Sequence, residues 1–224
     1  LAAGSIAAPL LLMRSGVGDP DVLAAAGVAT TTESRGVGKN LHDHLLGAGN
    51  LYRSARPVPP TRLNLSESMS YQSASDLTAR SGPADIVVGC VVAPSHSESF
   101  TVDVQPGGAY SLLFGVTNPT SRGELRISGA TIDDKPIIDP NYLDTAHDRE
   151  LFRVALERAR MVGQSDALAD WRGEEVLPGP GVSAGADLDA FIAAAAITHH
   201  HPVGTLSMGA GDAAPVTPDL AFRG

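Results

Sequence analysis

Three adjacent histidines, His199, His200 and His201, are the side chains of this sequence best suited to acid–base chemistry. An imidazole with an ordinary pKa of about 6.5 can accept a proton near neutral pH. Pro202 follows directly and disfavours the helical conformation for His201, so we expect an extended backbone. Side chains alternate along an extended chain. His199 and His201 should therefore project to one face, as two imidazoles aimed at a common space, and His200 to the other.

A metal centre is the first alternative use of these histidines. Zinc sites take three or four ligands at characteristic spacings, and this sequence has neither an HExxH pattern nor a cysteine pair. His42, Asp43 and His44 form only a partial ligand set, which we interpret as bracing a loop. No metal site is therefore expected. Structural histidines, held by hydrogen bonds to the backbone, are the second alternative.

The composition is that of a globular chain with a core of its own. The sequence has 224 residues, of which 43% are hydrophobic and 18% are charged. The formal net charge of -9 does not suit phosphate backbones or anionic lipids, so nucleic-acid and membrane partners are not expected. A single cysteine, Cys90, excludes an internal disulfide and suits a cytoplasmic location. The apolar residues 1–13 are too few to span a bilayer and lack the basic region of a signal peptide.

Helices and strands should alternate along the chain. A short helix is expected over residues 6–14, with Pro9 in its first turn, where a missing N–H costs least. A second helix over residues 21–26 should end at a glycine and lead into an extended segment over 28–32. Residues 36–44 should then form a polar loop rich in glycine.

The middle of the chain, residues 51–107, is rich in proline, serine and glycine, and only residues 86–93 within it are expected to form a strand. Residues 110–117 and 124–128 should form two strands of one meander, joined by a cluster of turn residues. This part of the chain is therefore expected to be a loop-rich second region.

The strongest helical pattern covers residues 148–162, where apolar side chains recur at spacings of three and four. A weaker, alanine-rich helix is expected over residues 187–197. The three histidines follow shortly after the end of that helix.

Five segments, in one order along the chain, carry a resemblance to a known family. They are GSIAAPLLLMRSGVG at residues 4–18, VGKNLHDH at 37–44, PTSRG at 119–123, IDPNYL at 138–143 and HPVGTLSMG at 201–209. In this order they resemble the signature segments of the glucose-methanol-choline (GMC) oxidoreductase family. Ala8 departs from the usual serine or threonine, Leu206 from the common cysteine and Ser207 from the common arginine. Five ordered matches are far more specific than any single one.

The resemblance implies a mixed fold, α/β and α+β, made of two interleaved parts. A partial doubly wound FAD-binding domain would be represented by residues 1–48, and a substrate domain of mostly antiparallel sheet plus helices by residues 49–197. Residues 198–224 would return to the FAD-binding domain and carry the catalytic histidine. Both ends of the chain look truncated relative to that fold.

The resemblance also implies a chemistry, the FAD-dependent oxidation of a primary alcohol to an aldehyde. His201 would take the proton of the substrate hydroxyl while a hydride passes to flavin N5, and His199 would orient the substrate. The partner would be a small-molecule alcohol. The residues carried over as flavin contacts are Gly4, Ser5, Pro9, Asn40, Asp43, His44, Pro202, Val203 and Gly204.

Two parts of the family pattern have no counterpart in this sequence. The GxGxxG turn that holds the FAD pyrophosphate is missing, and so is the second catalytic histidine or asparagine expected beyond the HPVGT segment. We therefore expect that these 224 residues alone would neither hold FAD tightly nor turn over. A non-enzymatic remnant of a flavoprotein is the alternative that this absence leaves open.

Within the family, the sequence is similar to members that oxidise the hydroxymethyl group of a pyridine ring. The paired His199 and His201 carry this similarity, together with residues 50–52, 57–60 and 66–69. A choline-type or aliphatic alcohol dehydrogenase is the alternative, and choline would require an aromatic cage for its quaternary ammonium. The aromatic residues available for such a cage are Tyr52, Tyr71, Tyr110 and Trp171.

Overall fold

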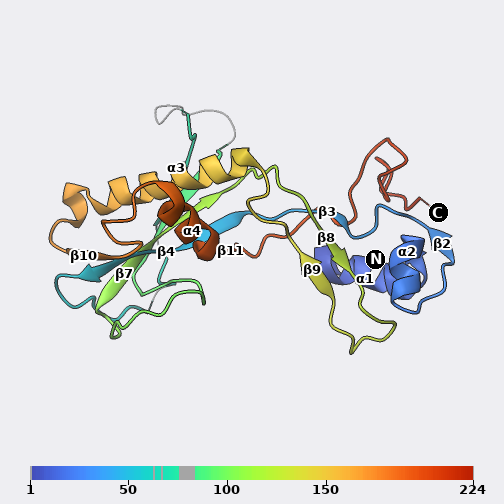
Figure 1. Cartoon of the computed structure of the whole chain (residues 1–224), viewed down its shortest axis with the longest axis horizontal. Coiled ribbons are helices and arrows are strands. Elements are labelled where there is room, and N and C mark those ends of the chain that lie inside the picture. Colours follow the sequence, from blue (N-terminus) through green and yellow to red (C-terminus); the bar gives the residue numbers. More distant parts are fainter. Residues whose placement is uncertain (1, 63, 67, 76–83, 224) are drawn as a thin grey trace. The chain divides into compact units, whose positions relative to one another are not determined.

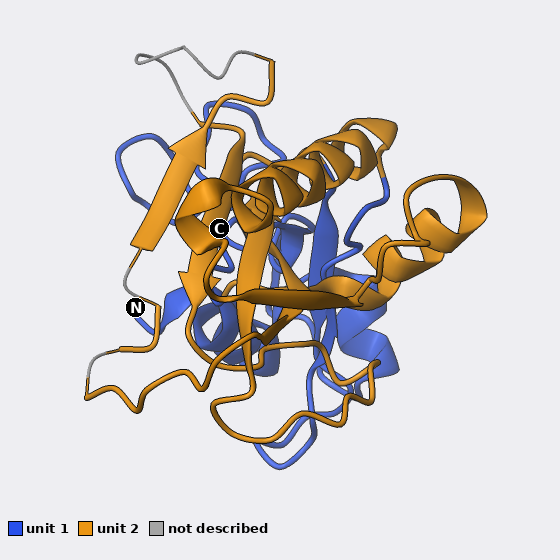
Figure 2. Ribbon diagram, turned by 90° about the vertical axis from the view of Figure 1, so that its left-hand side faces the viewer, with its two compact units in different colours: residues 1–43, 121–144, 200–224 blue, residues 44–120, 145–199 orange. Residues whose placement is uncertain are grey.

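A computed structural model describes residues 2–62, 64–66, 68–75 and 84–223. The chain forms two compact units, which Figure 2 shows in separate colours. Unit 1 contains Leu1–Asp43, Ser121–Asp144 and His200–Gly224, and unit 2 contains His44–Thr120 and Thr145–His199. The predicted boundaries at residues 48 and 198 lie close to two of these divisions. Residues 121–144 differ, because we assigned them to the substrate domain and they cluster with unit 1.

Unit 2 is built on a six-stranded antiparallel sheet. Its strands follow the order β10-β4-β7-β6-β5, and β11 also pairs with β4. The strands are β4 (Leu45–Ser54), β5 (Ser68–Gln72), β6 (Ile86–Val91), β7 (Ala109–Val116), β10 (Arg172–Leu177) and β11 (Ala196–Thr198). The antiparallel sheet with helices confirms the architecture that we expected for the substrate domain.

Helix α3 (Ala146–Gly163) lies along this sheet, as Figure 1 shows. Its buried residues recur every three or four positions, which matches the predicted amphipathic pattern. Thr145 caps the first turn by accepting a hydrogen bond from the backbone N–H of Asp148. Phe152 is fully buried and packs against Phe114 of β7, with ring centroids 4.9 Å apart. This aromatic pair joins helix and sheet at the centre of the core. A 3₁₀ turn (Asp166–Leu168) and helix α4 (Gly185–Ala195) complete the unit.

Two sequence predictions for this region are wrong. Strand β5 and residues 51–54 of β4 lie in the segment that we expected to be loop, because that segment is rich in proline, serine and glycine. Earlier in β4, Gly47 is required by close packing, since a Cβ there would meet the ring of Phe114 at 2.3 Å. The predicted meander of two strands also fails, because β7 and β8 belong to different sheets. Thr120 lies between these two strands. Its backbone N–H and its hydroxyl donate hydrogen bonds to buried Asp148 of α3, and these bonds hold the chain after β7 against the helix.

Unit 1 combines short helices with two small sheets. Its elements are α1 (Gly4–Arg14), β1 (Val17–Gly18), α2 (Pro20–Ala25), β2 (Thr32–Glu33), β3 (Lys39–Leu41), β8 (Gly123–Arg126) and β9 (Ile137–Asp139). β1 and β2 form a parallel pair, whereas β3, β8 and β9 are antiparallel. The strand β3 lies inside the segment that we expected to be a loop, and the extended segment expected from Val28 is shorter in the structure.

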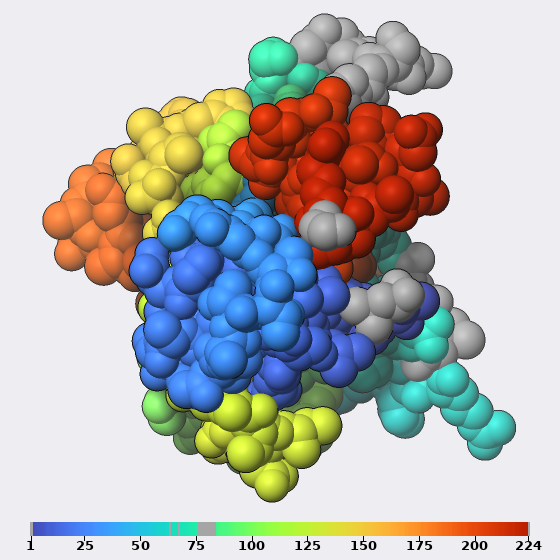
Figure 3. Space-filling view, turned by 90° about the vertical axis from the view of Figure 1, so that its right-hand side faces the viewer, coloured from blue at the N-terminus to red at the C-terminus, as the bar shows by residue number. Residues whose placement is uncertain are grey.

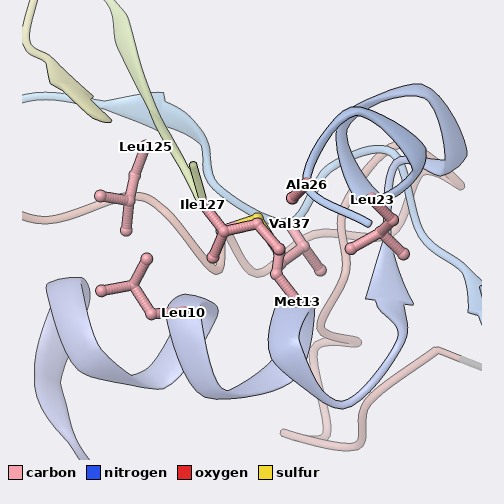
Figure 4. Close-up of a cluster of buried hydrophobic side chains, with 7 residues drawn as sticks. All are labelled: Leu10, Met13, Leu23, Ala26, Val37, Leu125 and Ile127. Atoms are coloured by element: carbon pink, nitrogen blue, oxygen red, sulfur yellow. The ribbon is translucent and has the colours of Figure 1, made fainter. Parts of the chain in front are cut away.

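The core of unit 1 is a single apolar cluster, shown in Figure 4. It gathers side chains from α1, from α2 and its C-cap, from the segment before β3, and from β8 and the residue after it. They are Leu10, Met13, Leu23, Ala26, Val37, Leu125 and Ile127. Gly38 lies against the carbonyl of Leu125 so closely that a Cβ would meet its oxygen at 2.2 Å. The N-terminal helices are thus packed on a strand that is more than a hundred positions away in the sequence.

The C-terminal segment lies beside the N-terminal one within unit 1, as Figure 3 shows in red and blue. The backbone N–H of Gly38 donates to the carbonyl of Thr205 at 2.8 Å. A Cβ on Gly36 would meet the carbonyl oxygen of Ala213 at 2.2 Å, so the two segments are in direct contact. Among the described residues, no helix has the length and the apolar character needed to cross a membrane.

We predict that Phe152→Ala lowers the free energy of unfolding by about 3–5 kcal/mol, because the substitution leaves a cavity opposite Phe114. The measurement is urea denaturation followed by far-UV circular dichroism. Met161→Ala is the matched control on the same helix, since Met161 is 55% exposed and its truncation should change stability by less than about 0.5 kcal/mol. Equal effects of the two substitutions would show that the helix does not pack as described.

Candidate active site

The histidine segment leaves the sheet of unit 2 and then pairs with the residue that follows β3. Thr198 of β11 pairs with Leu45, and the backbone N–H of His199 donates to the carbonyl of His44 at 3.1 Å. Val203 and His42 then exchange backbone hydrogen bonds of 2.8 and 3.0 Å. Between these two pairings, His200 has a φ of +63°. A left-handed residue therefore interrupts the extended run that we expected from His199 to His201.

Asp43 holds the backbone of His201. The carboxylate is 4% exposed. One of its oxygens, Oδ1, accepts the backbone N–H of His201 at 3.0 Å, and the other, Oδ2, accepts the hydroxyl of Tyr142 at 2.9 Å. Hydrogen bonds to a charged acceptor are among the stronger ones in proteins. We predicted Asp43 as a flavin contact, and in the structure its contacts within unit 1 position His201.

A proline and a threonine together fix the start of α1. The helix begins at Gly4, so Pro9 lies in the second turn and not in the first, contrary to our prediction. Proline has no N–H, and the carbonyl of Ser5 therefore lacks its regular helical partner. The hydroxyl of Thr205, a residue only 1% exposed, donates to this carbonyl at 2.5 Å. The hydroxyl of Ser5 in turn donates to the carbonyl of Pro202 at 2.5 Å.

Asn40 connects three more of the motif segments. Its backbone is left-handed, with a φ of +63°, a conformation that asparagine tolerates better than most residues. The side-chain oxygen accepts a hydrogen bond from Arg122 at 3.1 Å, and the amide donates to the carbonyl of Gly204 at 3.4 Å. Asn141 donates to the carbonyl of Arg122 at 3.1 Å. All five motif segments thus meet in one hydrogen-bonded network inside unit 1.

The imidazoles differ in their surroundings. His44 and His199, both in unit 2, are half-buried, and their ring centroids lie 6.2 Å apart at an interplanar angle of 51°. The side chain of His201 is exposed in this structure.

The predicted flavin contacts fall into two groups. Gly4, Ser5, Asn40, Asp43, Pro202, Val203 and Gly204 lie in unit 1 along the network described above, whereas His44 begins unit 2. Pro9 is buried, and its role in the structure is to free the Ser5 carbonyl. Gly204 has a φ of +95°, and a Cβ there would meet the carbonyl oxygen of Asn40 at 2.2 Å, so close packing requires this glycine.

A flavin nucleotide fits the residues at the N-terminus of α1. Ala3 provides no side-chain cap, and the first turn carries no acidic residue. The space beside Gly4 is open, since a Cβ there would meet nothing within 4 Å. The first N–H groups of a helix have no partner within the helix and attract acceptor atoms or anions. This donor set suits the phosphates and ring carbonyls of FAD.

Tyr142, Arg122 and Thr205 are the residues that the sequence analysis missed. Each lies inside a motif segment, yet nothing in the local sequence indicates a role. Their partners are 99, 82 and 200 positions away, respectively, so only the folded chain reveals them.

The chain belongs to the GMC oxidoreductase family. Two models of this family match it, one over residues 1–46 and the other over residues 119–224. The residues of the hydrogen-bonded motif network described above lie in these two regions. The family assignment made from the five segments is thereby confirmed.

Among relatives, pyridoxine 4-oxidase from Microbacterium luteolum is 54% identical over 224 residues, which is 100% of this chain and 44% of that protein. Choline oxidase from Arthrobacter globiformis is 30% identical, over 100% of this chain and 41% of its own length. A crystal structure of pyridoxine 4-oxidase from Mesorbium loti matches with a TM-score of 0.92 and 55% identity, covering 98% of this chain and 43% of that one. The chain thus spans less than half the length of these relatives.

We predict that Thr205→Val lowers the free energy of unfolding by about 0.5–1.5 kcal/mol, because the part-buried Ser5 carbonyl loses its hydrogen bond. In a Pro9→Ala background the same substitution should cost less, since residue 9 then has an N–H that can donate to Ser5. The measurement is a double-mutant cycle by urea denaturation.

Thr205→Ser keeps the hydroxyl and is the matched control, with an expected loss below that of Thr205→Val. Additive effects of Thr205→Val and Pro9→Ala would contradict the proposed link between the two residues.

Proposed function

We propose that this protein oxidises a primary alcohol to an aldehyde with FAD as the cofactor, and that pyridoxine, oxidised to pyridoxal, is the substrate. The observation that carries the proposal is the 54% identity to pyridoxine 4-oxidase along the entire chain, against 30% to choline oxidase. The single cysteine supports a cytoplasmic location.

In the proposed mechanism His201 is the base. A neutral imidazole accepts the proton of the substrate hydroxyl, which raises the electron density on oxygen and weakens the adjacent C–H bond. The hydrogen bond from the backbone N–H of His201 to the carboxylate of Asp43 fixes the position from which the ring reaches the substrate. His199 orients the alcohol. Bound FAD would supply the oxidant that accepts the hydride.

The flavin would be held by the unit 1 residues that the family resemblance identifies. The uncapped first turn of α1, at Gly4 and Ser5, offers backbone N–H groups to acceptor atoms. The side chain of Asn40 joins the segments around Asn40 and Gly204, which would form the adjoining wall of the flavin site.

A choline-type activity is the second candidate, supported by the 30% identity to choline oxidase. The structure gives it little support from aromatic residues. Tyr71 is 58% exposed on β5, and the face of Trp171 already carries the guanidinium of Arg56, at 3.7 Å from the ring centroid. Neither ring is therefore arranged as part of a cage for a quaternary ammonium.

The test is a chimera in which these 224 residues replace the matching 44% of Microbacterium luteolum pyridoxine 4-oxidase. We expect the chimera to bind flavin and to oxidise pyridoxine in preference to choline. His201→Ala should lower kcat by about 10²–10⁴-fold with the flavin absorbance retained, because it removes the base. His199→Ala should have a smaller effect.

His200→Ala is the matched control, since it removes an exposed neighbouring imidazole and should leave kcat near that of the unmodified chimera. Equal and small effects of all three substitutions would remove the assigned roles, and a preference for choline would overturn the substrate assignment.

A further inference from the structure

Unit 2 contains a cavity of about 530 Å³ that the proposed oxidation does not use. Its lining includes Val58, Cys90, Val92, Tyr110, Leu168 and Trp171. Pockets that bind small organic molecules commonly have volumes of about 300–1,000 Å³ and mainly apolar walls. This cavity has the size and the walls of such a site.

The cavity lies at the end of the sheet opposite to His44. Tyr110 pairs with Tyr52 at one end of the β4–β7 ladder, and Val116 pairs with Leu45, next to His44, at the other. The distance along β7 from Tyr110 to Val116 is about 20 Å for an antiparallel strand. The histidines of unit 2 are therefore too far away to act on a molecule held in this cavity.

Tyr110 has a buried hydroxyl without a hydrogen-bond partner among the described residues. The side chain is 4% exposed, and its Oη makes no hydrogen bond among the described residues. Burial raises the pKa of Tyr110 to about 12, so the hydroxyl stays protonated at neutral pH and can donate. Buried polar groups in folded proteins nearly always have a partner. An acceptor atom on a bound molecule would supply it.

The aromatic walls favour a flat ligand. The ring of Tyr110 is stacked on Tyr52, with centroids 5.6 Å apart and an interplanar angle of 12°. Trp171 lines the cavity and is covered on one face by Arg56, which holds the indole in place. Flat aromatic molecules gain most from contact with such rings.

The charges at the cavity argue against a cation. Arg62 is the one charged side chain among the described residues that line it, and they include no carboxylate. A quaternary ammonium would need the opposite arrangement. A neutral molecule meets neither repulsion nor the loss of a strongly hydrated charge.

We propose that this cavity binds a small, flat, neutral aromatic molecule with a hydrogen-bond acceptor that takes the hydroxyl proton of Tyr110. The site is separate from the proposed alcohol oxidation, and it does not depend on FAD.

The test uses Trp171, which is the sole tryptophan of the 224-residue chain and therefore a direct reporter of occupancy. Acetophenone carries an acceptor, and ethylbenzene has nearly the same shape without one. We expect saturable quenching of the Trp171 fluorescence by both. In Tyr110→Phe the affinity ratio of acetophenone to ethylbenzene should fall by about two- to tenfold, because one hydrogen bond is lost.

Tyr52→Phe is the matched control, because Tyr52 also has a buried hydroxyl without a partner among the described residues but does not line the cavity. It should leave the affinity ratio unchanged. Val92→Phe, which fills part of the cavity, should weaken both ligands, and saturation-transfer NMR should reproduce these results without relying on fluorescence. Circular dichroism shows whether each variant is folded.

Three results would overturn the proposal: no saturable binding of either molecule to the folded chain, an unchanged affinity ratio in Tyr110→Phe, or tighter binding of choline than of acetophenone. Each of these can be told apart from a failure of the proposed oxidation, because no measurement here involves flavin or turnover.

Discussion

Pro9 has no N–H, so the carbonyl of Ser5 lacks its donor within the helix. The hydroxyl of Thr205, 200 positions further along the chain, donates in its place. This hydrogen bond and that from Ser5 to Pro202 tie the start of α1 to the segment carrying His201. Loss of this hydrogen bond would weaken the contact between the two segments. Pro9 within α1 and the distant Thr205 therefore act together, since one removes a donor from the helix and the other replaces it.

The other motif segments extend this contact into a scaffold for His201. Asp43 connects the backbone of His201 to the hydroxyl of Tyr142, and Asn40 connects Gly204 to Arg122. These side chains form hydrogen bonds to the backbone or to one another, so the motif segments together hold the backbone around His201 in place.

The sequence predicted the family, the long helix α3 and the strands β6 and β7, because these depend on ordered motifs and on local periodicity. It failed where tertiary packing overrides local character. The segment from residue 51 is rich in proline and serine, yet pairing with neighbouring strands makes residues 51–53 and 68–72 extended. The extended run expected at the three histidines is interrupted by the left-handed backbone of His200. The roles of Tyr142 and Thr205 depend on partners so distant that no window of sequence could reveal them.

The assembly of unit 1 from three separate stretches of chain affects how the protein is made on the ribosome. Its last stretch begins at His200, so the hydroxyl that satisfies Ser5 emerges only when synthesis of these 224 residues is nearly finished. Contacts of such high sequence separation form slowly, because a long loop must close before they contribute any stability. The buried apolar cluster around α1, by contrast, uses residues no later than Ile127, so it can form earlier in synthesis than the hydrogen bond to Thr205.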